Sequence, residues 1–121
     1  MIKVFETTYD NELLKVNYVD DNNLFAGFDM ECDCCEYPSH RIEDSDGNII
    51  EPNYKNLFYD LIFTGELPEE DEWCDTCTAR IPLKHKTTNE RYYLVFSNCH
   101  NGWYAHGYEF GEIKIKHSSS V

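Results

Sequence analysis

The sequence has few basic residues and no long apolar run. Ten Lys and Arg stand against 23 Asp and Glu, which gives a formal net charge of -13. Direct binding of nucleic acid is disfavoured, because that affinity depends on Lys and Arg neutralising phosphates. No segment approaches the ~20 apolar residues of a membrane span, and residues 1–6 lack the basic and apolar regions of a signal peptide. We therefore expect a soluble, cytoplasmic protein.

The sequence also lacks the motifs of the common enzyme classes. It contains no G-x-S-x-G, no glycine-rich phosphate loop and no H-E-x-x-H. Cys99 with His100 or His106 could form a nucleophile pair, but no residue is evident that would orient the base. We expect a protein that works by binding, and a cysteine- or metal-dependent hydrolase is the least favoured alternative.

The acidic residues are concentrated in the first part of the chain. Residues 1–75 carry 20 acids and four bases, whereas residues 76–121 carry three acids and six bases. Such an asymmetry projects a negative field from one part of a protein and favours a partner with a basic surface. The alternative interpretation is a surface that only keeps the protein soluble.

The hydrophobic pattern predicts an α+β domain over residues 1–117, followed by a polar tail at 118–121. Alternating segments indicate six or seven short antiparallel strands, among them 2–8, 12–19, 24–32, 77–85, 91–99 and 103–110. The last three are expected to form a meander, with Asn101 and Gly102 in its second turn. Turns are also expected near Asp10 and at 44–48, and a loop at 66–75.

Residues 52–64 are the one helix candidate. Pro52 lies near the start of this segment and Gly65 follows its end, as is common at helix boundaries. Its apolar residues recur at the spacing of one helical face. They are Tyr54, Leu57, Phe58, Leu61 and Ile62.

Two C-x-x-C pairs predict a structural zinc site, a zinc knuckle. Cys32 and Cys35 form the first pair and Cys74 and Cys77 the second, so four thiolates could surround one Zn²⁺. Alternative ligands in place of a first-pair thiol are Cys34, His40 and His85. Such a site would clamp two distant loops and stabilise the fold.

A second metal site is an open alternative near the end of the chain. Cys99 and His100 could bind an ion together with His106. The competing interpretation is a buried strand cysteine beside a histidine of the hairpin.

Two short motifs resemble those of a family of small uncharacterised phage and bacterial proteins. They are Asp33-Cys34-Cys35-Glu36 and the hairpin Asn101-Gly102-Trp103-Tyr104, in which Trp103 departs from the usual tyrosine. The resemblance covers a minor part of the chain and implies little about activity. It gives Cys34 and Cys35 more weight as ligands than Cys32.

Size, acidity and the cysteine cluster together are similar to the zinc-containing type II anti-CRISPR proteins. That resemblance implies binding to Cas9 in a bacterial host cell and a block of its guide or target-DNA engagement. Cas9 holds its nucleic acids in positively charged channels, which an acidic surface could occupy. We expect the contact at the acidic loop, with an aromatic anchor, unless that loop is merely solvated. Its residues are Glu66, Glu69, Glu70, Asp71, Glu72 and Trp73.

Overall fold

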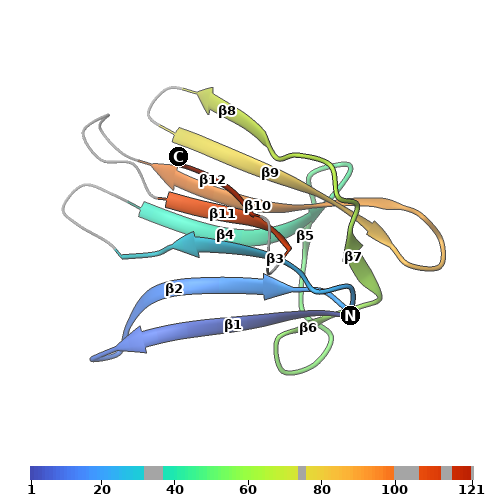
Figure 1. The fold of residues 1–121 in the computed structure, drawn as a ribbon, viewed down its shortest axis with the longest axis horizontal. Helices are drawn as coiled ribbons and strands as arrows, with labels where there is room; N and C mark the ends of the chain where they lie inside the picture. Colours follow the sequence, from blue (N-terminus) through green and yellow to red (C-terminus); the bar gives the residue numbers. More distant parts are fainter. Residues whose placement is uncertain (32–36, 74–75, 100–106, 113–115, 121) are drawn as a thin grey trace.

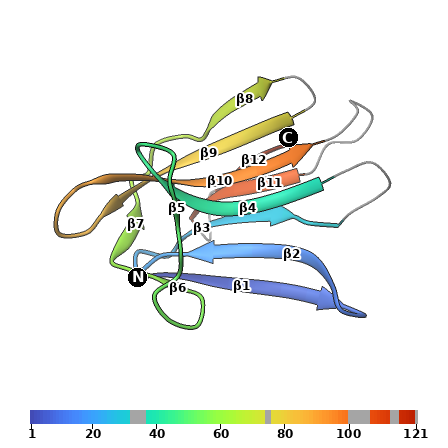
Figure 2. The same cartoon turned by 180° about the vertical axis from the view of Figure 1, so that it is seen from behind.

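The computed structural model describes residues 1–31, 37–73, 76–99, 107–112 and 116–120. Every regular element in these ranges is a β-strand, and the strands form two antiparallel sheets that pack face to face (Figures 1 and 2). The expectation of an α+β fold with one helix is therefore wrong. The expected count of six or seven strands is also too low, since twelve strands are found in the described ranges.

The first sheet, sheet A, has the strand order β12-β11-β3-β2-β1-β6. Its members are β1 (Ile2–Tyr9), β2 (Glu12–Val19), β3 (Leu24–Asp29), β6 (Leu57–Phe58), β11 (Gly107–Glu112) and β12 (Lys116–Ser120). The expected turn joins β1 and β2, where Asp10 and Asn11 adopt φ of 50° and 66°. Positive φ at both positions suits a two-residue hairpin. Residues 118–120 of the expected polar tail belong to β12.

The second sheet, sheet B, has the order β5-β4-β10-β9-β7. It contains β4 (Tyr37–Asp44), β5 (Ile49–Ile50), β7 (Leu61–Phe63), β8 (Glu69–Trp73), β9 (Thr76–His85) and β10 (Arg91–Cys99). Strand β8 pairs with the first half of β9, and β7 pairs with its end. Residues 69–73, expected to lie in a loop, therefore form an edge strand.

The segment expected to be a helix consists of two short strands and a turn. Lys55 and Asn56 adopt φ of 39° and 65°, which is incompatible with a right-handed helix. Phe58 of β6 is buried beside β1, and Leu61 and Phe63 of β7 both point into the core. Apolar residues of two short strands thus happened to fall at helical spacing, and strand partners distant in sequence decided the outcome.

The expected three-stranded meander is only half correct. Strands β9 and β10 form the antiparallel hairpin that the sequence predicts. The next described strand, β11, leaves this sheet and pairs with β3 of sheet A. The expected Asn101-Gly102 turn and Trp103 lie outside the described residues. Strand β11 is placed there because Tyr108 and Phe110, two positions apart, both point inward and complete the core from the side of sheet A.

The core lies between the two sheets and is rich in aromatic rings. Phe28 of sheet A stacks on Phe96 of sheet B with ring centroids 4.7 Å apart, and Phe63 contacts Phe110 at 5.5 Å. A buried carboxylate ties the layers together as well. Asp20 accepts hydrogen bonds from the backbone N–H of Asn22, Leu24 and Phe63, each 2.9–3.0 Å long. The sandwich therefore depends on both apolar packing and one fully satisfied buried acid.

Candidate functional site: the cysteine end and the acidic edge

The register of sheet B brings the chain segments next to the cysteines to one end of the sheet. Cys99 lies opposite Tyr37 of β4 and Thr76 of β9, and Thr76 in turn lies opposite Trp73 of β8. Cys77 lies one position further along β9 and opposite Asn98. The structure therefore brings Cys77 and Cys99 to the same end, which we call the cysteine end.

The predicted ligands other than Cys77, Cys99 and two histidines lie outside the described residues. Cys32, Cys34, Cys35 and Cys74 lie outside the described residues, as do His100 and His106. Sheet B aligns four described residues that flank these segments, Tyr37, Trp73, Thr76 and Cys99. Two other flanking residues, Glu31 and Gly107, do not belong to sheet B, since Glu31 follows β3 and Gly107 begins β11. Within the described ranges, no group of three or more His, Cys, Asp or Glu is arranged to hold a metal ion.

Asn98 is an unusual residue of the cysteine end. It is fully buried, and it lies in the row of β10 side chains that faces the core with Phe96 and Leu94. In the part of the chain that the structure describes, neither its amide nitrogen nor its carbonyl oxygen has a hydrogen-bond partner. A buried amide without partners costs free energy. This end therefore has an unused hydrogen-bond donor and acceptor that a ligand, water or thiolate could engage.

The two alternative histidine ligands are held elsewhere. His40 is half-buried on β4, and its Nδ1 lies 2.5 Å from the Tyr18 hydroxyl of sheet A. Burial lowers the pKa of His40, and nearby Glu6 opposes that effect. His85 lies at the far end of β9, and its Nδ1 accepts the backbone N–H of Thr87 and Thr88 at 3.2 Å. Eight residues of strand, about 27 Å, separate it from Cys77, so these two residues are not brought together.

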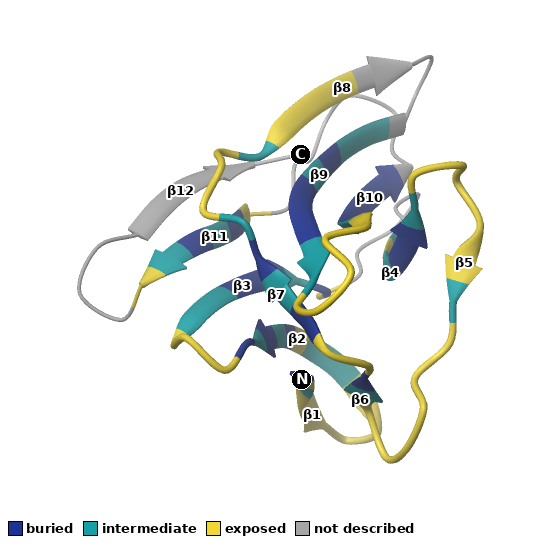
Figure 3. Cartoon of the chain, turned by 90° about the vertical axis from the view of Figure 1, so that its right-hand side faces the viewer, coloured by how far each residue is buried: buried dark blue, intermediate teal, exposed yellow. Residues whose placement is uncertain are grey.

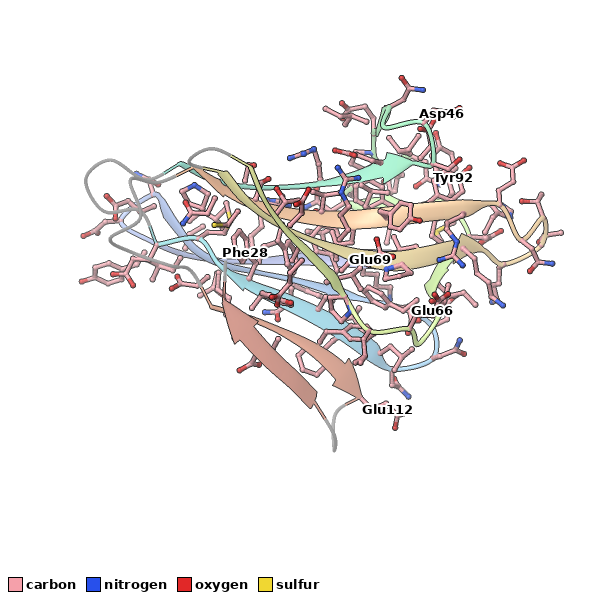
Figure 4. The ribbon with its side chains drawn as sticks, turned by 90° about the horizontal axis from the view of Figure 1, so that it is seen from above. Phe28, Asp46, Glu66, Glu69, Tyr92 and Glu112 are labelled. Atoms are coloured by element: carbon pink, nitrogen blue, oxygen red, sulfur yellow. The ribbon has the colours of Figure 1, made fainter. Side chains whose placement is uncertain are left out.

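The predicted acidic contact region divides into inward and outward carboxylates. Glu66 pairs with Arg91 at 3.0 Å, which lowers the pKa of the Glu66 carboxyl. Glu70 accepts a hydrogen bond from the Tyr108 hydroxyl, so it faces sheet A. Because strand side chains alternate, Glu69 and Asp71 point away from the sandwich, and both are exposed (Figure 4 labels Glu66 and Glu69).

Two further predicted contact residues belong to the same strand. Glu72 and Trp73 pair through their backbones with Cys77 and Thr76, but their side chains lie outside the described part of the structure. The strand character of this segment left no signal in the sequence, since a surface edge strand has no apolar face to alternate with a polar one. Strand β8 thus carries the acidic edge directly to the cysteine end.

A buried carboxylate lies on β4, on the outer face of sheet B, with β10 and β9 between it and β8. Glu43 is only 5% exposed and accepts a hydrogen bond from Arg41 Nε, while Arg80 Nη1 lies 3.5 Å from it. Glu69 lies opposite Arg80 in the β8–β9 register. Arg80 therefore pairs with Glu43, and among the described residues it forms no ion pair with Glu69 or Asp71.

Comparisons with known proteins assign neither a family nor a function to the chain. No family model, no curated protein and no solved structure matches the chain. Within the described residues, no helix has the length and apolar character needed to span a membrane.

Proposed function

We propose that this protein is an acidic binding protein that docks the β8 edge onto a basic surface of a nucleic-acid-handling host protein. The observation that carries the proposal is the exposed acidic edge strand, on which Glu69 and Asp71 point outward. Cas9 is the candidate partner, and the effect of binding would be to block its guide or target-DNA engagement.

The geometry of β8 supports such docking in two ways. Its backbone pairs with β9 on one side, while no strand of the described ranges pairs with its other side. A partner segment could therefore reach both the backbone edge and the outward carboxylates. A formal net charge of -13 would also speed the encounter with a basic surface and make it sensitive to salt.

The competing explanation for the same carboxylates is protection of an exposed edge. Charged side chains on edge strands prevent pairing with other copies of the chain. The two explanations make different demands on the edge strand. Protection requires only charged side chains, whereas docking requires carboxylates at the positions of Glu69 and Asp71.

The test is gel filtration of the protein with guide-loaded Cas9 at low and moderate salt. The variant Glu69→Gln/Asp71→Asn should weaken the complex about two- to tenfold, as two exposed charge pairs would. The control Glu12→Gln/Glu112→Gln changes the net charge equally, at exposed positions on sheet A. Equal weakening by both variants would leave only net charge as the cause. Absence of a complex at either salt, with apo or guide-loaded Cas9, would reject Cas9 and favour a module with another protein partner.

We also propose that Zn²⁺ stabilises the cysteine end, with Cys77 as a ligand and Cys32, Cys35 and Cys74 completing the shell. Cys34 remains the alternative to either Cys32 or Cys35. The shared end of β4, β8, β9 and β10 supports this site, and so does the unpartnered amide of Asn98, since metal-bound thiolates commonly accept hydrogen bonds from nearby donors. A zinc ion there would hold β8, and hence the acidic edge, against β9.

A further inference from the structure

An open hollow of about 460 Å³ lies at the end of sheet B opposite the cysteines. It is bordered by β5, by β7 and the residues just before it, and by the β9–β10 hairpin. Figure 3 looks onto this end, with β7 and the hairpin near the centre and β5 to the right. All the residues that line it are described.

The hollow combines an apolar base with two tyrosine rings. Leu61 is 1% exposed and lies beneath the opening, and Ile50 adds a second aliphatic side chain. Tyr59 is 48% exposed, and Tyr92 is half-buried with its hydroxyl donating to Glu90 at 3.2 Å. Burial and this hydrogen bond raise the pKa of Tyr92, so the phenol stays neutral. The apolar base could therefore cover the aliphatic stem of a long side chain.

The charge of the hollow has one sign. Glu51 and Glu90 line it, and the Asp44 carboxylate acts on Tyr92 from nearby. No Lys or Arg is among the lining residues. His85 also lines the hollow, but its Nδ1 serves as an acceptor for two backbone N–H groups. A positively charged group would thus meet two carboxylates and two aromatic rings.

We propose that this hollow binds an arginine side chain presented by a protein partner. A guanidinium stacks on aromatic rings and pairs with carboxylates in a fixed planar geometry, which suits this combination better than the compact lysine ammonium. Exposed Ile49 and Tyr59 would be covered by the flanking residues of the partner. The site involves neither β8 nor the cysteine end, so the proposal is independent of the proposed function and can be tested separately.

The test is a two-dimensional ¹⁵N–¹H NMR titration of the full chain with Nα-acetyl-arginine amide. Nα-acetyl-citrulline amide is the matched probe, because it keeps the shape of arginine and lacks its charge. The expected result is a saturable shift of amide signals around Ile50, Thr88 and Tyr92 with the arginine probe alone. Glu51→Gln/Glu90→Gln should abolish saturation, and Tyr59→Ala should raise the Kd about two- to fivefold. Glu12→Gln/Glu112→Gln, with the same change of charge away from the hollow, should leave the titration unaltered.

Three results would overturn the proposal. Equal shifts with the citrulline probe would show that charge is not recognised. Shifts that spread over the whole chain, or that persist in Glu51→Gln/Glu90→Gln, would indicate a diffuse ion atmosphere. Equal affinity for Nα-acetyl-lysine amide would remove the assignment to guanidinium. Because Glu51, Glu90 and Tyr59 are exposed, their substitutions should not unfold the chain, and the dispersion of the NMR spectrum checks this directly.

Discussion

At the scale of single residues, the most informative positions are buried polar groups that join the two sheets. Asp20, only 6% exposed, connects the β2–β3 turn to Phe63 of β7 in the other sheet. His40 and Tyr18 make a second polar link across the core. Groups of this kind are expensive to leave without partners, so small substitutions there should have large effects.

Asp20→Ala should lower the free energy of unfolding by about 2–3 kcal/mol, since the buried N–H of Phe63 would lose its acceptor. Urea unfolding followed by circular dichroism measures this change. The neighbouring Asp21→Ala is the control, because Asp21 is exposed and pairs only with the N-terminal ammonium and Lys86 among the described groups. That control should lose no more than about 1 kcal/mol. Equal losses would contradict the role assigned to Asp20.

The His40–Tyr18 pair predicts a pH dependence of stability. Burial lowers the pKa of folded His40 below its ordinary value of 6.5, so the unfolded chain binds this proton more readily. The contribution to stability is complete above pH 6.5 and is lost as the pH falls below it. The thermal midpoint of the wild type should therefore fall between pH 7 and pH 5, a range above the ordinary carboxyl pKa values.

His40→Gln keeps a side chain that can hydrogen-bond to the Tyr18 hydroxyl and removes the titrating ring. The decline between pH 7 and pH 5 should become shallower in this variant, as measured by differential scanning calorimetry. A decline as steep as that of the wild type would assign the effect to other groups.

At the scale of elements, the segment 52–64 shows how local pattern and tertiary pairing compete. A helix would have buried Tyr54 and Phe58 on one face. In the strands that form instead, Tyr54 is 62% exposed while Phe58 is 5% exposed. The two arrangements therefore make different predictions for two aromatic residues four positions apart.

Phe58→Ala should cost about 3–5 kcal/mol, as expected for a buried aromatic ring. Tyr54→Ala should cost less than about 0.5 kcal/mol, as surface substitutions usually do. Chemical denaturation of both variants measures the difference. A loss at Tyr54 as large as that at Phe58 would favour the helix and contradict the arrangement of β6 and β7.

At the scale of the whole molecule, a zinc ion at the cysteine end would couple stability to metal. The protein purified without chelator should contain about one zinc ion per chain, and removing it should lower the unfolding midpoint. Metal analysis by mass spectrometry together with calorimetry tests this. Absence of zinc would reject the site.

Serine variants then distinguish the two proposed uses of the cysteines. Cys77→Ser should lose both the metal and the stability that it confers. Cys99→Ser should retain the metal. If the wild type instead contained two zinc ions per chain and Cys99→Ser only one, the second site with His100 and His106 would be supported.

The sequence by itself was enough for the strands with clear alternation and for their tight turns. The β1–β2 hairpin with Asp10 and Asn11, and the β9–β10 hairpin, form as predicted. Local backbone preference and alternating hydrophobicity suffice there, since the paired strands are neighbours in sequence. The excess of acid over base is likewise a property of composition alone.

The partners of the short strands were decided only by the tertiary structure. Strands β6 and β7 depend on β1 and β9, and β11 joins β3 from far along the chain. No local pattern encodes such pairings, because their stability comes from burying Phe58, Leu61 and Phe110 between the sheets. The pairing of β8 with β9 likewise divides the acids of β8 into inward and outward groups. The acidic strand β8 and Cys99 lie far apart in the sequence, and the register of sheet B brings the end of β8 and Cys99 to one end of the sheet.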